Sequence, residues 1–182
     1  MPKTPRRITA AYLARVTGHY LERYSTSRAN LERLLLRRVY RSAAFYEVDP
    51  EPWRALVTVE LDRLERIGLV DDDAYARDKA RALHRRGSGL RKIRFTLQQK
   101  GLRSNVIDDA LARLSEGGDP DWFAACTYAR KRSLGPWRRA ALDDDRRRKE
   151  LGRLARAGFP FDIARRIVEA PSIEALGDAE GA

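Results

Sequence analysis

The side chains of this sequence that could carry metal chemistry are two runs of aspartate. Asp71-Asp72-Asp73 and Asp143-Asp144-Asp145 could hold a divalent cation, because hard cations favour clustered carboxylates. Each run precedes a helix-forming segment, where aspartate more often caps free backbone N–H groups and complements the helix dipole. Neither run has the glycine-centred spacing of a calcium loop. We therefore interpret both runs as helix caps and predict no metal site.

The other candidate groups for catalysis or nucleotide binding are isolated. His19 and His84 have no cysteine or acid at ligand spacing, and Cys126 lies on an apolar stripe, where a small buried side chain is expected. Gly87-Ser88-Gly89 precedes a helix and could cradle a phosphate, but it lacks the Gly-Lys-Ser/Thr ending and follows a helix instead of a strand. We predict a flexible helix–helix turn there, no cofactor and no enzyme active site.

Composition predicts that helices position these groups. The 182 residues include 25 alanines, 21 leucines and 31 arginines against 8 valines, 7 isoleucines and 7 threonines, and straight-chain residues lose less rotamer freedom in a helix than β-branched ones do. No stretch alternates as a half-buried strand does. No apolar run approaches the roughly 20 residues of a membrane span, no apolar segment follows the N-terminus, and one cysteine forms no internal disulfide. We expect an all-α protein of the cytoplasm that makes no membrane contact.

Apolar residues recur with the helical period in short segments that glycine, proline and aspartate interrupt. A first helix is expected over residues 10–24, Ser25-Thr26-Ser27 offers N-caps for the second, and Asp119-Pro120 opens a later one. The segments group in threes. We predict a basic N-terminal arm, three successive three-helix repeats and a flexible tail, at residues 1–9, 10–70, 71–118, 119–170 and 171–182.

Two segments match as an internal repeat. Lys92–Leu111 and Lys149–Val168 share an initial lysine and pair Leu97 with Leu154 and Gly101 with Gly158, at a spacing of 57 residues. The first set of helices matches more loosely. Helical units too small to bury their apolar faces alone stack on their neighbours, which predicts an elongated, curved, solenoid-like body of tandem three-helix repeats.

The formal net charge of +11 is unevenly distributed along the chain. Residues 1–46 carry +8, residues 81–105 carry +8 without a single acid, and residues 127–158 carry +7, whereas the segments between them are acidic. Basic blocks of this kind indicate contact with a polyanion such as nucleic acid. We predict as contact residues Arg81, Arg85, Arg86, Arg91, Lys92, Arg94, Lys100, Arg130, Lys131, Arg132, Arg138, Arg139, Arg147, Arg148 and Lys149.

Two alternatives to this interpretation remain open. Arginine-rich helical surfaces can be merely solvated, although blocks without counter-charges are poor candidates for structural ion-pair networks. Trp137 lies in the basic, loop-like segment Gly135–Arg139, and its ring either contacts a nucleic acid or partner or serves packing. Trp53 and Trp122 occupy positions expected to face the core.

Several ordered motifs resemble the RecX family of bacterial regulatory proteins. They are GLVDDDAYA at Gly68–Ala76, RGxGxxKIxxxLxxKG at Arg86–Gly101 and Ile107-x-x-Ala110-Leu111. Ser27, Leu31 and Leu35 fit upstream, as does Lys149–Phe159 downstream, so the resemblance covers roughly residues 10–170. It implies tandem three-helix repeats forming a curved, elongated monomer.

The resemblance also implies a function. RecX proteins modulate the recombinase RecA: they bind its filament on single-stranded DNA, interfere with ATP hydrolysis and strand exchange, and so restrain recombination and the SOS response. The expected partners are therefore the RecA filament and single-stranded DNA, with double-stranded DNA as a further candidate. The alternative is a general helical DNA- or RNA-binding protein that acts without RecA.

Overall fold

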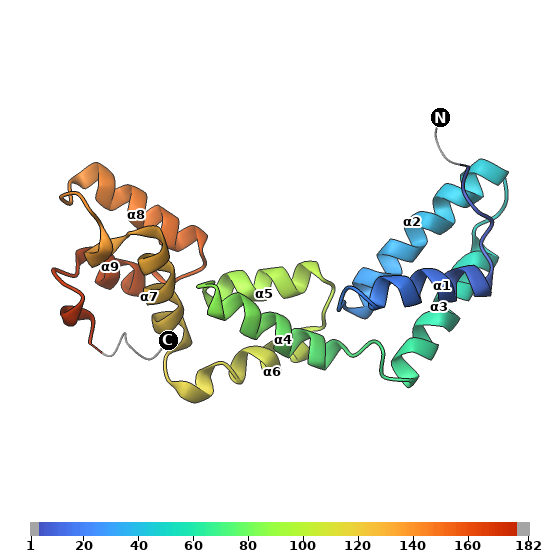
Figure 1. Cartoon of the computed structure of the whole chain (residues 1–182), viewed down its shortest axis with the longest axis horizontal. Coiled ribbons are helices and arrows are strands. Elements are labelled where there is room, and N and C mark those ends of the chain that lie inside the picture. The colour runs from blue at the N-terminus through green and yellow to red at the C-terminus, as the bar shows by residue number, and fades with distance from the viewer. Residues whose placement is uncertain (1–3, 178–182) are drawn as a thin grey trace. The chain divides into compact units, whose positions relative to one another are not determined.

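The structure, a computed structural model, describes residues 4–177. Within that range the secondary structure is entirely helical, which confirms the predicted all-α class (Figure 1). The described chain forms two compact units. The first comprises the residues up to Tyr75 together with Lys100–Leu102, and the second comprises Ala76–Gln99 and the residues from Arg103 on. Among the helices of the described residues, none is both long and apolar enough to cross a lipid bilayer.

The first unit packs three helices, α1 (Ala10–Leu21), α2 (Arg28–Tyr46) and α3 (Glu51–Arg66). Ser27 caps α2, as the sequence predicts, because its hydroxyl accepts the Asn30 N–H at 3.3 Å. The expected first helix is too long: α1 ends at Leu21, because the Arg23 N–H donates to the Tyr20 carbonyl three residues back instead of to a carbonyl four residues back. The core side chains come from all three helices and from both flanking segments, namely Ile8, Leu13, Leu31, Leu35, Val39, Val57, Leu61, Leu64 and Val70.

Polar contacts fix α1 and the described part of the basic arm within this unit. The buried Thr17 hydroxyl donates to Glu60 Oε1 at 2.7 Å, which ties α1 to α3. Arg63 donates to the same carboxylate and, together with the Thr17 hydroxyl, lowers the pKa of Glu60 against the opposing effect of burial. The arm lies on α2, where Ser42 Oγ donates to the Arg6 carbonyl at 2.9 Å.

The second unit contains the larger part of α4 (Asp72–Arg85), α5 (Leu90–Gln99), α6 (Ser104–Ala112), α7 (Pro120–Arg132), α8 (Asp144–Arg156) and α9 (Phe161–Glu169). Asp119 caps α7, because its carboxylate accepts the Trp122 N–H at 3.2 Å and Pro120 takes the first helical position. Helices α7, α8 and α9 share one core that includes Trp122, Cys126 and Phe159. The burial of Cys126 and Trp122 agrees with the sequence analysis.

The segment expected to form a flexible tail is partly packed. Residues Glu174–Leu176 form a 3-10 helix, and Leu176 is buried in the core of the second unit. Burial of the Leu176 side chain removes apolar surface from water and so favours the packed position of this described part. The remaining residues of the predicted tail, 178–182, lie outside the described range.

A joint within the first unit connects the start of α2 with Asp72 and with Lys100–Leu102, which follow α5 in the sequence. The Arg28 N–H donates to Asp72 Oδ1 at 2.8 Å, and Ser27 Oγ donates to the Lys100 carbonyl at 2.5 Å. Gly101 adopts φ +77°, and a Cβ atom there would lie 2.5 Å from Ala29 Cβ. Only glycine fits this position, because both the backbone conformation and the close approach exclude a side chain.

The same joint recurs at the start of α5, within the second unit. The Leu90 N–H donates to Asp121 Oδ1 at 2.7 Å, and the Gly89 N–H donates to the Ala157 carbonyl at 2.9 Å. Gly158 adopts φ +96°, and a Cβ atom there would lie 2.6 Å from the Lys92 nitrogen. Each joint thus holds the N-terminus of one helix with the same two devices. One is an aspartate near the start of a second helix, and the other is a glycine that follows a third. The pairing of Gly101 with Gly158 in the sequence repeat therefore has a structural cause.

We predict that Asp121→Ala destabilises the protein by about 1–2 kcal/mol, because it leaves the Leu90 N–H without an acceptor. Asp121→Asn keeps an oxygen acceptor and removes a charge that burial disfavours. Burial raises the pKa of Asp121, partly opposed by the Leu90 N–H, and Asp119 adds to the rise. Urea unfolding of both variants across a pH series measures the difference.

The pH dependence has a defined sign. Folding raises the pKa of Asp121. The contribution of this carboxyl to the free energy of unfolding of the wild-type protein therefore decreases as the pH increases from the unfolded pKa of about 3.9 through the folded pKa. The stability of Asp121→Asn relative to wild type should therefore increase across that window and stay constant above it. An asparagine variant as unstable as the alanine variant at every pH would contradict the capping role.

Candidate nucleic-acid interface

The predicted basic face centres on α5 and on the end of α4. Helix α5 buries Ile93 and Leu97 completely, which leaves Arg91 and Lys92 exposed on the opposite side. Arg85 and Arg86 are exposed where α4 ends, as is Arg81 one turn earlier. None of these five side chains forms an ion pair or hydrogen bond with another side chain within residues 4–177. They therefore present positive charge directly to solvent.

The turn between α4 and α5 is fixed in place and offers no phosphate cradle. The N–H groups of Gly87, Ser88, Gly89 and Leu90 donate to His84, Leu83, Ala157 and Asp121, respectively. A phosphate-binding loop needs such N–H groups to be free. These N–H groups are therefore not available to a phosphate. The turn is also not flexible as expected, because its first two N–H groups close the end of α4 and its last two are held by Ala157, which follows α8, and by Asp121 of α7.

The end of α7 brings a second basic block next to the first. Lys131 Nζ donates to the Arg85 carbonyl at 3.3 Å, and a Cβ atom at Gly87 would lie 2.9 Å from the Tyr128 nitrogen. Arg130 and its two successors are exposed on this last turn. Arg132 lies over the Tyr128 ring at 5.9 Å. The basic residues at the end of α4 therefore lie next to the basic residues on the last turn of α7, within the second unit.

Several other predicted contact residues have acidic partners. Arg94 pairs with Asp108 of α6 at 2.7 Å, and Lys149 pairs with Asp145 at 2.5 Å. Arg147 forms an ion pair with Glu169 of α9, and Arg148 lies 4.0 Å from Asp145. Residues 81–105 include no acid, but the fold brings Asp108 of α6 next to Arg94. The position of Arg94 in the sequence does not indicate this contact.

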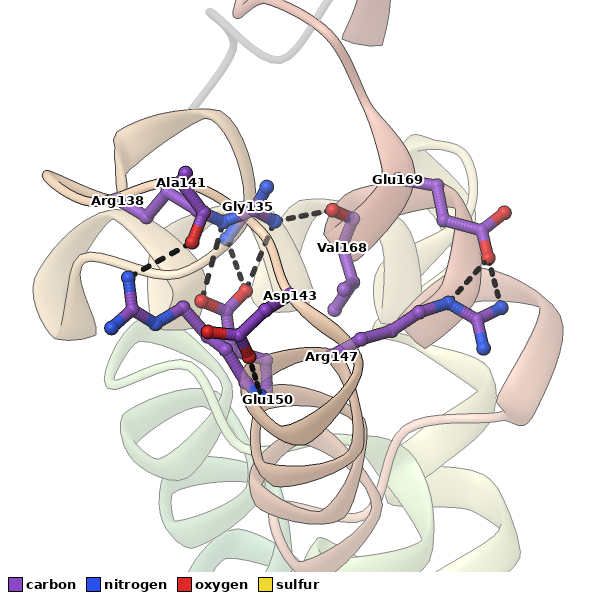
Figure 2. Close-up of polar contacts among 9 residues, drawn as sticks. Gly135, Arg138, Ala141, Asp143, Arg147, Glu150, Val168 and Glu169 are labelled. Carbon is purple, nitrogen blue, oxygen red and sulfur yellow. Dashed lines mark hydrogen bonds and ion pairs between the residues drawn. The ribbon is translucent and has the colours of Figure 1, made fainter.

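Arg138 belongs to the interior of the second unit (Figure 2). Its guanidinium donates to the buried Glu150 carboxylate, at 3.1 Å for the closer oxygen, and to the Val168 carbonyl. Glu150 also accepts the Gly135 N–H at 2.9 Å. The Arg138 and Glu150 side chains are 14% and 5% exposed. The guanidinium is therefore used to join α8, α9 and the preceding loop, and its neighbour Arg139 is exposed without a partner in the described chain.

A cavity of about 380 Å³ lies beside this contact. Its lining includes Arg139, Lys149 and Arg153, but also Asp143 and Asp145, so cations and acids alternate around it. Asp143 Oδ1 accepts the Arg146 N–H at 2.7 Å, and Asp71 Oδ1 accepts the Ala74 N–H at 2.9 Å, which confirms both aspartate runs as helix caps. Within residues 4–177, no three His, Cys, Asp or Glu side chains gather as a metal site would require.

The two histidines and Trp137 each have identifiable neighbours in the fold. His84 Nε2 lies 2.8 Å from the Pro120 carbonyl, and His19 is exposed beside Glu22. Trp137 is half-buried against the core of the second unit, which favours packing over nucleic-acid contact. The predicted cations whose side chains have no hydrogen-bond, ion-pair or ring partner of any kind among the described residues are Arg81, Arg85, Arg86, Arg91, Lys92, Lys100, Arg130 and Arg139.

The two adjacent arginines of the loop before α8 should behave differently. We predict that Arg138→Ala lowers the free energy of unfolding by about 3 kcal/mol, because it leaves the Glu150 carboxylate buried without its cation. Arg139→Ala should change it by less than about 0.5 kcal/mol. Urea unfolding followed by circular dichroism compares the two variants. Equal effects would contradict the structural role of Arg138.

The sequence resembles that of named regulatory proteins over most of its length. It is 38% identical over 170 residues to the "Regulatory protein RecX" of Myxococcus xanthus, covering 92% of this chain and 90% of that protein. It is 33% identical over 138 residues to the protein of the same name from Agrobacterium fabrum, covering 74% and 72% of the two chains. The family model described as "RecX, second three-helix domain" matches residues 71–111.

Solved structures share the fold. A crystal structure of RecX from Lactobacillus salivarius aligns with a TM-score of 0.63 at 21% identity, covering 87% of this chain and 94% of that one. A second crystal structure of regulatory protein RecX aligns with a TM-score of 0.62 at 23% identity, covering 87% and 70%. Together with the sequence identity over nearly the whole chain, these matches show that the chain belongs to the RecX family of regulatory proteins.

Proposed function

We propose that this protein binds the filament that the recombinase RecA forms on single-stranded DNA and restrains its ATP hydrolysis and strand exchange. The observation that carries the proposal is the basic surface of the second unit, where exposed cations at the ends of α4 and α7 and on α5 have no acidic partner among the described residues. Membership of the RecX family supports the choice of RecA. In this proposal the protein acts as a monomer and catalyses no reaction.

A DNA-coated filament suits such a surface for two physical reasons. Its phosphates release counterions when arginine and lysine approach, which gives affinity without sequence preference. Its protein subunits repeat along the strand, so that several weak contacts made by one molecule raise the overall affinity more than any of them could separately. The division into three repeats, at residues 10–70, 71–118 and 119–170, belongs to the same proposal, because successive repeats would supply successive contacts.

The sharpest test neutralises the central cations and keeps a control of equal charge. The variant carries glutamine at Arg85, Arg86, Arg91 and Lys92, and the control carries glutamine at four other exposed arginines, namely Arg113, Arg153, Arg156 and Arg165. Substoichiometric wild-type protein should slow ATP hydrolysis by RecA on single-stranded DNA. The first variant should need about tenfold more protein for the same effect, because it loses several phosphate contacts, and the control should act like wild type.

Circular dichroism checks that both variants keep their helices, since all eight side chains are exposed. An unchanged rate of ATP hydrolysis over a wide range of wild-type concentrations would overturn the proposed function. If that rate stayed unchanged while the wild type bound bare nucleic acid tightly with a steep salt dependence, the chain would be a general helical DNA- or RNA-binding protein that acts without RecA. Equal inhibition by both variants would overturn the assignment of the central basic face.

A further inference from the structure

A groove between α1 and α2 in the first unit lies outside the predicted contact residues. It has a volume of about 360 Å³, within the range of small-molecule sites. Helix α1 contributes four lining residues, the turn that follows α1 contributes two, and α2 contributes two residues one turn apart. The lining residues are Arg15, Val16, His19, Tyr20, Arg23, Tyr24, Leu34 and Arg38.

The rim of the groove is cationic. It contains Arg15, Arg23 and Arg38, and no aspartate or glutamate lines it. Arg38 Nη1 donates to the Tyr12 hydroxyl at 3.2 Å, which holds the guanidinium in place at the groove. Glu22 lies 3.6 Å from His19 Nδ1 but is not part of the lining. Arg23 has no partner within the described residues, so its charge is available to a ligand.

An aromatic platform adjoins these cations. The rings of Tyr20 and Tyr24 lie 5.2 Å apart at an interplanar angle of 41°. Tyr20 packs against the core of the first unit, whereas Tyr24 is 57% exposed. The platform has a firm base, because the Thr17–Glu60 hydrogen bond holds α1 on α3. An exposed ring beside several guanidinium groups can stack a flat ligand whose charge the arginines neutralise.

We propose that this groove binds one nucleotide of a single-stranded nucleic acid, with the base on Tyr24 and the flanking phosphates at Arg23 and Arg38. Stacking on an aromatic ring needs an unpaired base, so the groove selects single strands over duplex. The arginines alone would also suit an acidic protein segment, but the exposed ring gains from a base and not from a carboxylate. The proposal rests on the proposed function only in that the strand is the one the filament contains.

Two fluorescent probes of equal length separate base stacking from charge: an oligothymidine and an abasic strand with the same phosphates. Wild-type protein should bind the thymidine strand about tenfold more tightly than the abasic strand, the effect of one stacked base. Tyr24→Ala should abolish this preference, and Tyr24→Phe should keep it. Tyr40→Ala removes another exposed tyrosine, which lies outside the groove lining, and should also keep it. Arg23→Gln should weaken binding of both strands equally.

Ultraviolet cross-linking of a strand containing 5-iodouracil, mapped by mass spectrometry, gives a second measurement that needs no substitution and should identify Tyr24. An unchanged thymidine preference in Tyr24→Ala would overturn the proposal. Displacement of the strand by a polyglutamate peptide, equally from wild type and from Tyr24→Ala, would also overturn it and assign the groove to acidic protein. Either result leaves the proposed function intact if wild-type protein still slows ATP hydrolysis by RecA, because these assays contain no recombinase.

Discussion

The start of α5 depends on hydrogen-bond acceptors that other helices supply, and the arrangement of the second unit follows from this. The first N–H groups of a helix have no partner within the helix. Asp121 and the Ala157 carbonyl accept those of Leu90 and Gly89, and Gly158 lets the backbone approach closely enough. With its N-terminus held and Ile93 and Leu97 buried, α5 turns the side that carries Arg91 and Lys92, and also Phe95, to solvent. The same device at Arg28, Asp72 and Gly101 explains why the sequence repeats its glycines.

The large positive charge of the chain divides into two populations. One population is structural: Arg138 neutralises a buried carboxylate, and Arg94 and Arg147 join neighbouring helices through ion pairs. The other population, at the ends of α4 and α7 and on α5, has no acidic partner among the described residues. Because these exposed side chains form no ion pairs, removing their charge should change the free energy of unfolding little. In the proposed function, this second population contacts an anionic partner.

Much of the fold could be predicted from the sequence because its signals are local. Helical periodicity, the Ser27 and Asp119 caps and the glycines after α5 and α8 each depend on residues within a few positions. The role of Arg138 could not be predicted, because Glu150 reaches it only through the loop before α8. The available signal was Glu150 itself, which is the one acid in residues 146–156 and lies one turn before the apolar Leu154. The α1–α2 groove could not be predicted either, because its tyrosines have the spacing of core residues. Tyr24 is exposed because α1 ends before it, at Leu21.

The central claim is that the α5 face of this RecX-family protein contacts the RecA filament. Its most direct test places a photoreactive benzophenone amino acid at Arg91, on α5, or at Arg165, an exposed arginine on α9. Each labelled protein is irradiated on RecA filaments assembled on single-stranded DNA, and adducts are quantified. The account predicts abundant adducts to RecA or DNA from position 91 and few from position 165. Equal yields from both positions, or a higher yield from position 165, would contradict it.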